Sequence, residues 1–331
     1  MSSQTWAYTS NALVYSTIIV LAFSLLAFAA DLAVGTGRKR ADAAKLRRAS
    51  LARQGGNGAR GVGAAVLTSA SPEAPADERW ARVGVSLTTL AATLVVGGVV
   101  ARGVSAQRPP WGNMYEFTIT AVATMLVIWV GMLPRRPDWR DLGIVVVLFN
   151  LLLLGVAVLV LYTESAQLVP ALKSYWLWIH VSAAIIASSV FAVGSLASVL
   201  YLFAERYERR ATSLSRGGLL DALGARLPAS DQLDKVAYQT IAFAFPLWFF
   251  AVVAGAVWAE DAWGRYWGWD PKEVWSFVTL VVYAAYLHAR ATAGWRGRPA
   301  AIIAIVGLAA FLFSYFGVNI FFVGLHSYGG A

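Results

Sequence analysis

A tryptophan-rich segment is the most unusual feature of this sequence. Five of the chain's 14 tryptophans fall in the 18 residues WAEDAWGRYWGWDPKEVW, which run from Trp258 to Trp275. An aromatic belt, in which rings lie at the surface of a membrane, accounts for the first and last, because both stand at the ends of apolar segments. The other three are interleaved with glycines, which let flat rings and backbone approach a planar ligand closely. We interpret these three as the walls of a site for a flat, apolar ligand: Trp263, Trp267 and Trp269.

The residues that follow these tryptophans form a helix start. Asp270 at the N-cap, Pro271 at the first helical position and Glu273 at the third are typical of that position. We interpret capping as the main role of Asp270 and ligand contact as a secondary one, since a rigid helix start would hold the tryptophans in place. Arg265 and Lys272 are the only cations between residues 259 and 274. They are therefore candidates to neutralise acidic groups of a ligand.

Two histidines flank the tryptophan-rich segment in the sequence. His180 lies near the start of the apolar segment 178–203, and His326 follows the last apolar segment. The distribution of cations places both on the side of the membrane that carries the tryptophans. Two imidazoles at one level suit axial ligation of a haem iron. In the alternative interpretation, each is an ordinary amphipathic side chain at the membrane interface.

The third histidine lies at a different depth. His288 is about 13 residues into the apolar segment 275–293, which is ~20 Å from the outer end of a helix. An ionisable group so deep in a membrane indicates a function. In the alternative interpretation, His288 hydrogen-bonds a neighbouring helix near the inner interface, two residues before Arg290.

The composition places these residues in a membrane protein. Hydrophobic residues make up 58% of the 331 residues and charged residues 14%, whereas a soluble domain carries about 25% charged residues. The chain has no cysteine, which excludes disulfides, a cysteine nucleophile and cysteine-ligated metal sites. We predict an all-α polytopic membrane protein with about eight transmembrane helices, because a crossing needs ~20 apolar residues. The eight segments of that length are 11–33, 83–105, 116–134, 142–163, 178–203, 237–258, 275–293 and 299–322.

Cations are distributed unequally between the connections. Residues 34–82, 134–141, 204–236 and 289–298 hold 22 of the 27 Lys and Arg residues. By the positive-inside rule these connections face the cytoplasm, so both termini and the connection 259–274 lie outside. The formal net charge of +9 is then a topological signal with some attraction to anionic lipid, and we expect no nucleic-acid partner. We predict a multi-pass protein of the plasma (cell) membrane with its tryptophan-rich loop on the outer face.

We expect a single membrane domain over residues 1–331. Residues 34–82 mix Arg, Gly, Ala and Ser, which indicates a flexible basic cytoplasmic linker, and a short helix near 41–53 is compatible with this composition. Residues 204–236 are a second cytoplasmic connection, in which Ser230 begins a helix. The first apolar segment is longer than the apolar region of a signal peptide and no Lys or Arg precedes it, so we expect no cleavage there.

The chain resembles the CcsA/ResC family of cytochrome c biogenesis proteins, whose actinobacterial-type members are called CcsB. The family belongs to the haem-handling superfamily named for its tryptophan-rich WWD loop, which residues 259–274 resemble. The strongest match is WAEDAWGRYWGWDPKEVWSFVTLVVYAAYLHAR. Three further motifs follow in the family's order: NMYEF at 113–117, LVPALKSYWLWIHV at 168–181 and GVNIFFVGLHSYG at 317–329. Together the motifs cover most of residues 106–330.

The resemblance implies a function. With a ResB-type membrane partner, such a protein moves haem b outward and presents it for covalent attachment to the CxxCH thiols of apocytochrome c, as part of a cytochrome c synthase. The resemblance implies that His180 and His326 are the two external haem ligands. It implies that His288 is the histidine within the membrane that is thought to take part in haem passage. The residues that match the WWD loop itself are Trp263, Trp267, Trp269 and Asp270.

The residue types suit haem, which is flat, apolar and acidic at its propionates. Tryptophan rings would form the walls, the two external histidines would supply axial nitrogens, and Arg265 or Lys272 would neutralise a propionate. Holding the vinyl groups beside the incoming thiols would supply much of the catalysis through orientation. The histidine of the CxxCH motif would then displace one external ligand as product forms.

Two other functions fit the same composition. One is a permease or channel for another solute, with the tryptophan loop as an outer gate; a Soret band in the purified protein distinguishes it from a haem protein. The other is a non-catalytic scaffold for a ResB-type partner, in which haem stays with the partner alone. Within the superfamily, the system-one haem-delivery proteins share the loop, but NMYEF and the eight-span plan favour the CcsA branch.

Overall fold

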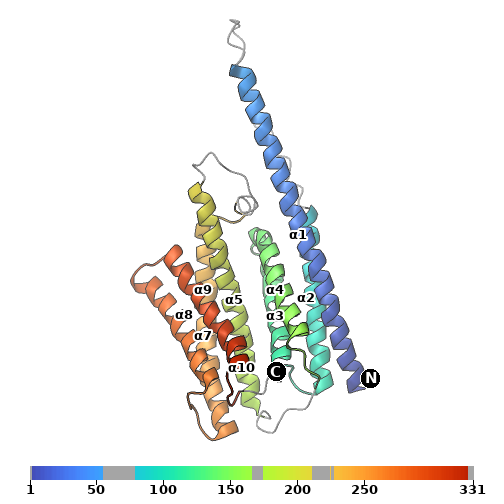
Figure 1. Ribbon diagram of the computed structural model, residues 1–331, viewed down its shortest axis with the longest axis vertical. Helices are drawn as coiled ribbons and strands as arrows, with labels where there is room; N and C mark the ends of the chain where they lie inside the picture. Colours follow the sequence, from blue (N-terminus) through green and yellow to red (C-terminus); the bar gives the residue numbers. More distant parts are fainter. Residues whose placement is uncertain (1, 55–78, 166–173, 211–223, 225–226, 327–331) are drawn as a thin grey trace.

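The fold is a bundle of long helices (Figure 1). The structure is a computed structural model that describes residues 2–54, 79–165, 174–210, 224 and 227–326, and within these ranges every regular element is a helix. The α-helices are α1 (Ser3–Gln54), α2 (Arg79–Ala106), α3 (Met114–Met132), α4 (Gly143–Leu159), α5 (Tyr175–Arg209), α7 (Ser230–Trp263), α8 (Pro271–Thr292), α9 (Arg298–Leu312) and α10 (Val318–Phe321). A 3₁₀ helix, η1 (Pro137–Leu142), precedes α4, and a π-helical turn, η4 (Phe313–Gly317), joins α9 to α10.

The predicted all-α polytopic architecture is confirmed. Among the described residues, seven helices are long and apolar enough to cross a membrane, and they correspond to seven of the eight predicted segments. The remaining segment, predicted over 142–163, forms α4, which has 17 residues and ends at Leu159. Because a crossing needs ~20 residues, α4 is shorter than the predicted span.

The first helix is longer than we expected. We predicted a flexible linker from residue 34, with at most a short helix near 41–53, but α1 continues without a break to Gln54. The segment is rich in Ala, Leu, Arg and Lys, which favour helix, and contains no Pro. Figure 1 shows this part of α1 extending well beyond the other helices. The rest of the predicted linker, residues 55–78, lies outside the described residues.

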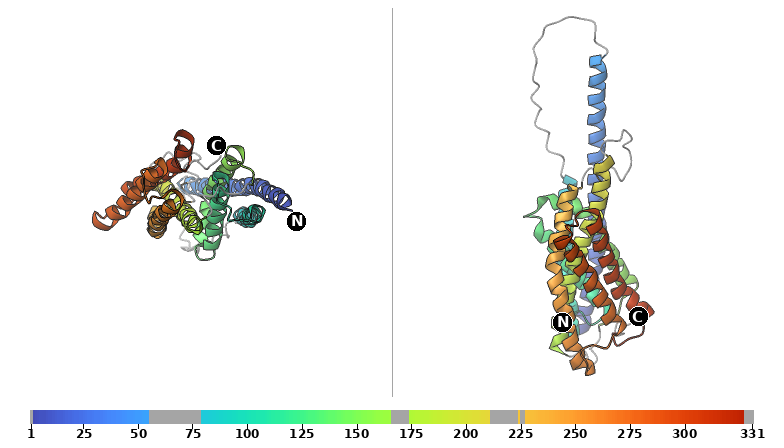
Figure 2. Two further views of the ribbon diagram at one scale, coloured as in Figure 1. Left: turned by 90° about the horizontal axis from the view of Figure 1, so that it is seen from below. Right: turned by 90° about the vertical axis from the view of Figure 1, so that its left-hand side faces the viewer.

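The helices form two groups, α1–α4 and α5–α10 (Figure 2). In the first group α1 packs along α2, and in the second α5 packs along α7 and α9, while α3 contacts both α4 and α5 and so joins the groups. Small residues allow close approach between α1 and α2: Ser10 Oγ donates to the Gly98 carbonyl at 2.8 Å, and Ser24 Oγ donates to the Gly84 carbonyl at 2.9 Å. Such contacts are typical of helix pairs in lipid, where apolar packing alone favours no particular partner.

One end of the bundle gathers the segments that the sequence placed outside. The start of α1, the connection 107–113, the loop 264–270 between α7 and α8, and residues 322–326 all lie there (Figure 1). We call this end the tryptophan-loop end. The opposite end carries the end of α5, the start of α7 and the turn 293–297 between α8 and α9. That the tryptophan-loop end faces the outside of the cell stays a prediction from the cations.

Candidate functional site

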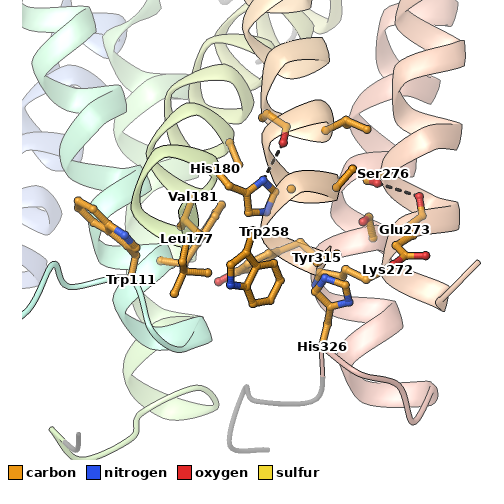
Figure 3. A pocket seen from close by; sticks show the side chains of 18 of the residues that line it. Trp111, Leu177, His180, Val181, Trp258, Lys272, Glu273, Ser276, Tyr315 and His326 are labelled. Carbon is orange, nitrogen blue, oxygen red and sulfur yellow. Dashed lines mark hydrogen bonds between the residues drawn. The ribbon is translucent and has the colours of Figure 1, made fainter. Parts of the chain in front are cut away.

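A cavity of about 210 Å³ opens at the tryptophan-loop end (Figure 3). It lies between α3, α5, α7, α8 and η4, with the loops 107–113 and 264–270 and residue 326 closing its rim. Most of its walls are apolar or aromatic, which is typical of ligand sites, and a few polar groups face it. The wall residues include Trp111, Met114, Leu177, Trp248, Trp258, Trp267 and Tyr315, and the polar groups include His180, Lys272 and His326.

The ring of His180 is oriented by a backbone carbonyl. Its Nδ1 lies 2.7 Å from the carbonyl oxygen of Ala251 on α7. A carbonyl oxygen only accepts hydrogen bonds, so Nδ1 carries the proton and Nε2 keeps a free lone pair. Gly255, one turn further along α7, makes room for the ring, because a Cβ there would lie 2.7 Å from the imidazole Cε1. His180 is therefore held with Nε2 available to bind a metal.

The ring of His326 is oriented by a carboxylate. Its Nδ1 lies 2.9 Å from Oδ1 of Asp270. Burial by itself opposes ionisation of Asp270, but hydrogen bonds from His326, Leu325 and Lys272 outweigh it and lower the pKa of Asp270 to about 2. The carboxylate is therefore ionised at neutral pH and accepts the Nδ1 proton, which leaves Nε2 of His326 free. An imidazole with its other nitrogen bonded to a carboxylate or carbonyl is the usual arrangement of a metal-binding histidine.

Asp270 also caps α8, as the sequence led us to expect. Its Oδ1 accepts from the backbone N–H of Lys272 at 3.0 Å, and the side chain of Glu273 accepts in return from the Asp270 N–H at 3.0 Å. Glu273 also accepts from the N–H of Gly268 at 2.8 Å, which ties the tryptophan loop to the helix start. The Asp270 carboxylate thus joins the start of α8 to the C-terminal segment that carries His326.

The two candidate cations have different surroundings. Arg265 Nη1 lies 3.2 Å from Oε1 of Glu273, so its charge is already balanced by a carboxylate of the chain. Lys272 lines the cavity, and its Nζ lies 5.6 Å from the centre of the Tyr315 ring. In the part of the chain that the structure describes, no carboxylate lies within 4.0 Å of Nζ. Lys272 is therefore the better placed of the two to meet an acidic ligand.

The three tryptophans expected to form the walls occupy three different positions. Trp267 lines the cavity. Trp263 is not among the residues that line the cavity, and its ring centre lies 4.9 Å from that of His326. Trp269 lies outside the cavity: it is 67% exposed and packs edge-on against Trp267. Its backbone has φ +59°, which turns the chain so that the next residue, Asp270, can cap α8 and leaves the ring directed away. The expectation that Trp269 forms a wall does not fit this geometry.

Trp258 is a residue that we assigned to an aromatic belt and that the structure places in the cavity. Its side chain is 2% exposed, and its ring centre lies 6.2 Å from that of His180 and 5.8 Å from that of His326 (Figure 3). Its position at the end of an apolar segment looks the same in the sequence whether the ring faces lipid or the bundle interior. Only the packing of α7 against α5 distinguishes the two.

The NMYEF motif forms a further wall that residue types alone did not reveal. Asn113 caps α3, and Met114 at its start lines the cavity. Glu116 is fully buried and accepts from Arg102 Nε at 3.0 Å and from Arg108 Nη1 at 2.7 Å. It also accepts from the backbone N–H of residue 112 at 2.9 Å. This buried ion cluster fixes the connection 107–113, which places Trp111 and Asn113 at the cavity rim.

His288 does not contribute to the cavity. It lies on α8, four residues before the last one, and its side chain is exposed. Among the described residues its imidazole has no hydrogen-bond partner. The alternative interpretation, in which His288 bonds a neighbouring helix of the same chain, thus finds no support in this part of the chain.

Most of the chain is similar to proteins of cytochrome c biogenesis. Residues 111–326 match the family described as Cytochrome C assembly protein. The cytochrome c biogenesis protein CcsA of Synechocystis sp. is 35% identical over 298 residues, which cover 76% of this chain and 89% of that protein. CcsA of Guillardia theta is 36% identical over 259 residues, which cover 75% of this chain and 85% of that protein.

Other relatives are more similar over a shorter length. The CcsA protein of Parasynechococcus marenigrum is 43% identical over 180 residues, and the chain covers 59% of its length. The family match covers more than half of the chain, and the Synechocystis relative is covered over most of its length. The chain therefore belongs to the cytochrome c assembly protein family, whose members include the cytochrome c biogenesis proteins named CcsA.

Proposed function

We propose that this protein is the haem-handling subunit of a membrane cytochrome c synthase. In this proposal the cavity at the tryptophan-loop end binds haem b through His180 and His326 and presents it for covalent attachment to apocytochrome c. One observation carries the proposal: two imidazoles on one cavity each have Nδ1 engaged with an acceptor and Nε2 free. This is the state in which histidine binds a metal.

The small number of metal-binding side chains favours a metal that already carries most of its ligands. No group of three or more His, Asp or Glu side chains suited to a bare metal ion occurs in the described part of the chain. A haem iron already has four ring nitrogens and needs only axial ligands, which two histidines supply. His180 and His326 thus match the requirement of haem better than that of a free zinc or iron ion.

The polar groups of the cavity favour an acidic ligand. The indole nitrogens of Trp111 and Trp258 are buried donors without a partner among the described residues. Lys272 adds a cation whose Nζ has no carboxylate within 4.0 Å among the described residues. A cavity with unpaired buried donors suits a ligand that carries carboxylates, because unpaired buried polar groups cost free energy. Haem brings two propionates, so we assign their recognition to Lys272 rather than to Arg265.

In the reaction, this chain binds and orients its substrate. The CxxCH motif of apocytochrome c supplies the thiols, and the aromatic walls and axial histidines hold the vinyl groups in reach of them. Positioning of this kind supplies much of the rate enhancement, and no acid or base of this chain is required. The CxxCH histidine then replaces one of the two external ligands.

Haem reaches this cavity by a route that we assign to His288. The exposed imidazole on α8 has no partner in the described part of the chain, and a polar group that faces lipid is costly. A ResB-type membrane subunit would cover this face of α8 and supply the second axial ligand for haem in transit. We also assign the protein to the plasma membrane, with the tryptophan-loop end outside and the basic connections near anionic lipid.

The absorption spectrum of the purified full-length protein tests the proposed function. We expect a Soret band and a six-coordinate, low-spin haem spectrum. Replacing His180 or His326 with Ala should open one coordination position and reduce cytochrome c maturation in cells, whereas His288→Ala serves as the matched control and should keep the spectrum of externally loaded haem. A protein without a Soret band, or unchanged spectra in both external-histidine variants, contradicts the proposal.

A further inference from the structure

The two external histidines have different hydrogen-bond acceptors. The Nδ1 of His180 lies 2.7 Å from the backbone carbonyl oxygen of Ala251, whereas the Nδ1 of His326 lies 2.9 Å from a carboxylate oxygen of Asp270. We propose that Asp270 is a positioning residue that makes the two histidines unequal ligands, with His326 the stronger donor to iron and His180 the weaker. This inference rests on the proposed function, in which both histidines bind one haem iron.

Asp270 holds the whole segment around His326 and not only its ring. Its Oδ2 accepts from the backbone N–H of Leu325 at 2.8 Å, while Oδ1 accepts from His326 and from the start of α8. Residues 322–326 follow the end of α10 and are not helical, so their own backbone does not fix the ring. One buried carboxylate therefore sets both the place and the tautomer of His326.

The residue beside Leu325 has to be small for this arrangement. A Cβ on Gly324 would lie 2.5 Å from Oδ2 of Asp270. Real Cβ contacts are not that short, so any larger residue at 324 would push the segment away from the carboxylate. Gly324→Ala therefore strains the contact between this segment and Asp270 while keeping the carboxylate group itself.

His180 is held in place by its helix and a backbone carbonyl rather than by a carboxylate. It is part of the long helix α5, and its ring lies in the space left by Gly255, where Nδ1 donates to the Ala251 carbonyl. A carbonyl orients the ring but adds no negative charge. A carboxylate both orients an imidazole and raises its basicity, which strengthens the bond from Nε2 to a metal. The iron–His180 bond is then the one that opens first when haem is handed on.

A double-mutant cycle on haem release tests this inequality. The full-length chain is purified with haem as His180→Ala and as His326→Ala, each with and without Asp270→Asn, and transfer of haem to excess apomyoglobin is followed in the Soret band. With His326 as the remaining ligand, Asp270→Asn should speed release by about 10–100-fold, the usual effect of losing such a partner. With His180 as the remaining ligand, the same change should leave the rate essentially unaltered.

The choice of Asn separates the positioning role from the capping role. Asn caps helices well, so α8 keeps its start. Its amide NH₂, however, would face the Leu325 N–H in place of Oδ2, and its uncharged oxygen is a weaker acceptor for His326. The haem reduction potential gives a second readout: in the His180→Ala background it should rise with Asp270→Asn, because a less basic ligand stabilises the ferric state less.

Three results overturn the inference. Equal acceleration in both backgrounds would show that Asp270 only supports the fold, and no acceleration in the His180→Ala background would show that it does not strengthen His326. If Asp270→Asn fails to accumulate, Gly324→Ala decides: it should reproduce the selective effect, and a uniform effect contradicts the proposal. Asp261→Asn, an exposed carboxylate near the end of α7, is the matched control. A wild-type protein that binds no haem at all contradicts instead the proposed function on which the inference rests.

Discussion

The imidazole of His180 on α5 packs directly against Gly255 on α7. A Cβ atom at position 255 would lie 2.7 Å from the ring Cε1 and 2.8 Å from Nδ1. The ring cannot move away freely, because Nδ1 is bonded to the carbonyl of Ala251. The orientation of the proposed axial ligand thus depends on a residue of another helix that has no side chain.

Gly255→Ala should therefore disturb the proposed haem site while leaving helix α7 folded. The added methyl group displaces the His180 ring at a cost of about 1–3 kcal/mol, typical of overpacking. We expect less haem per protein and a spectrum that resembles that of His180→Ala. Gly155→Ala in α4 is the control, because a Cβ there meets nothing within 4 Å. Haem content equal to wild type in Gly255→Ala would show that the ring position is not restricted in this way.

The surroundings of Lys272 predict selectivity for the charged form of haem. Loss of a hydrogen bond to a charged group costs about 1.5–3 kcal/mol, so Lys272→Gln should weaken binding of haem clearly. It should hardly affect binding of haem dimethyl ester, which has no free propionate. The measurement is a titration of the purified protein with both compounds, with Lys235→Gln, at the exposed start of α7, as the control. An equal loss for both compounds would contradict propionate recognition by Lys272.

The Glu116 cluster predicts a large effect on stability. Glu116→Gln leaves the buried guanidinium of Arg102 without this carboxylate, and breaking a buried pair costs about 3–5 kcal/mol. We expect a lower midpoint of thermal unfolding in detergent and loss of haem as the rim moves. Glu205→Gln makes the same chemical change in a pair with Arg209, which is 69% exposed, so about 0–1 kcal/mol is expected there. Similar midpoints for the two variants would contradict the anchoring role of Glu116.

The exposed position of His288 predicts a defect in supply and not in binding. His288→Ala should leave the cavity intact, so haem added from outside to the purified complex should give a normal spectrum. In cells the same variant should carry little haem per folded protein, because the relay is broken. Normal haem occupancy in cells would rule out the relay. A reduced amount of protein with normal haem content would instead indicate a packing role.

The distribution of cations predicts the orientation in the membrane. Reporters fused near residue 55 or residue 217 should report the cytoplasm, and reporters after Trp263 or after residue 331 should report the outside. The structure brings the start of α1, the loop 264–270 and residue 326 to one end, so these positions should agree with one another. A cytoplasmic C-terminus would contradict the placement of His326 on the outer side.

Several features followed from the sequence because they depend on local chemistry. Long apolar runs form helices wherever lipid surrounds them, since the backbone has no other partner there. The Asp270–Glu273 helix start was predictable because capping involves residues only three apart. The tryptophan loop and the three histidines were identified by residue type and spacing. The length of α1 beyond residue 34 was not, because glycines and arginines there suit both a linker and a helix.

Which of these residues meet could be seen only in the folded chain. Residues far apart in the sequence lie on one cavity, and the contacts that fix them, Ala251 with His180 and Asp270 with His326, cross between segments. Residue type could not distinguish the position of Lys272 from that of Arg265, because both carry the same charge. It could not distinguish Trp269 from Trp267, because both carry the same ring. The composition and the apolar runs of the sequence were enough to predict a helical membrane protein, and its tryptophans and histidines suggested the flat, acidic, metal-bearing ligand that we propose. The packing of α7 and α8 decided which nitrogen atoms, rings and charges face that ligand, since distances between helices depend on contacts that no local pattern records.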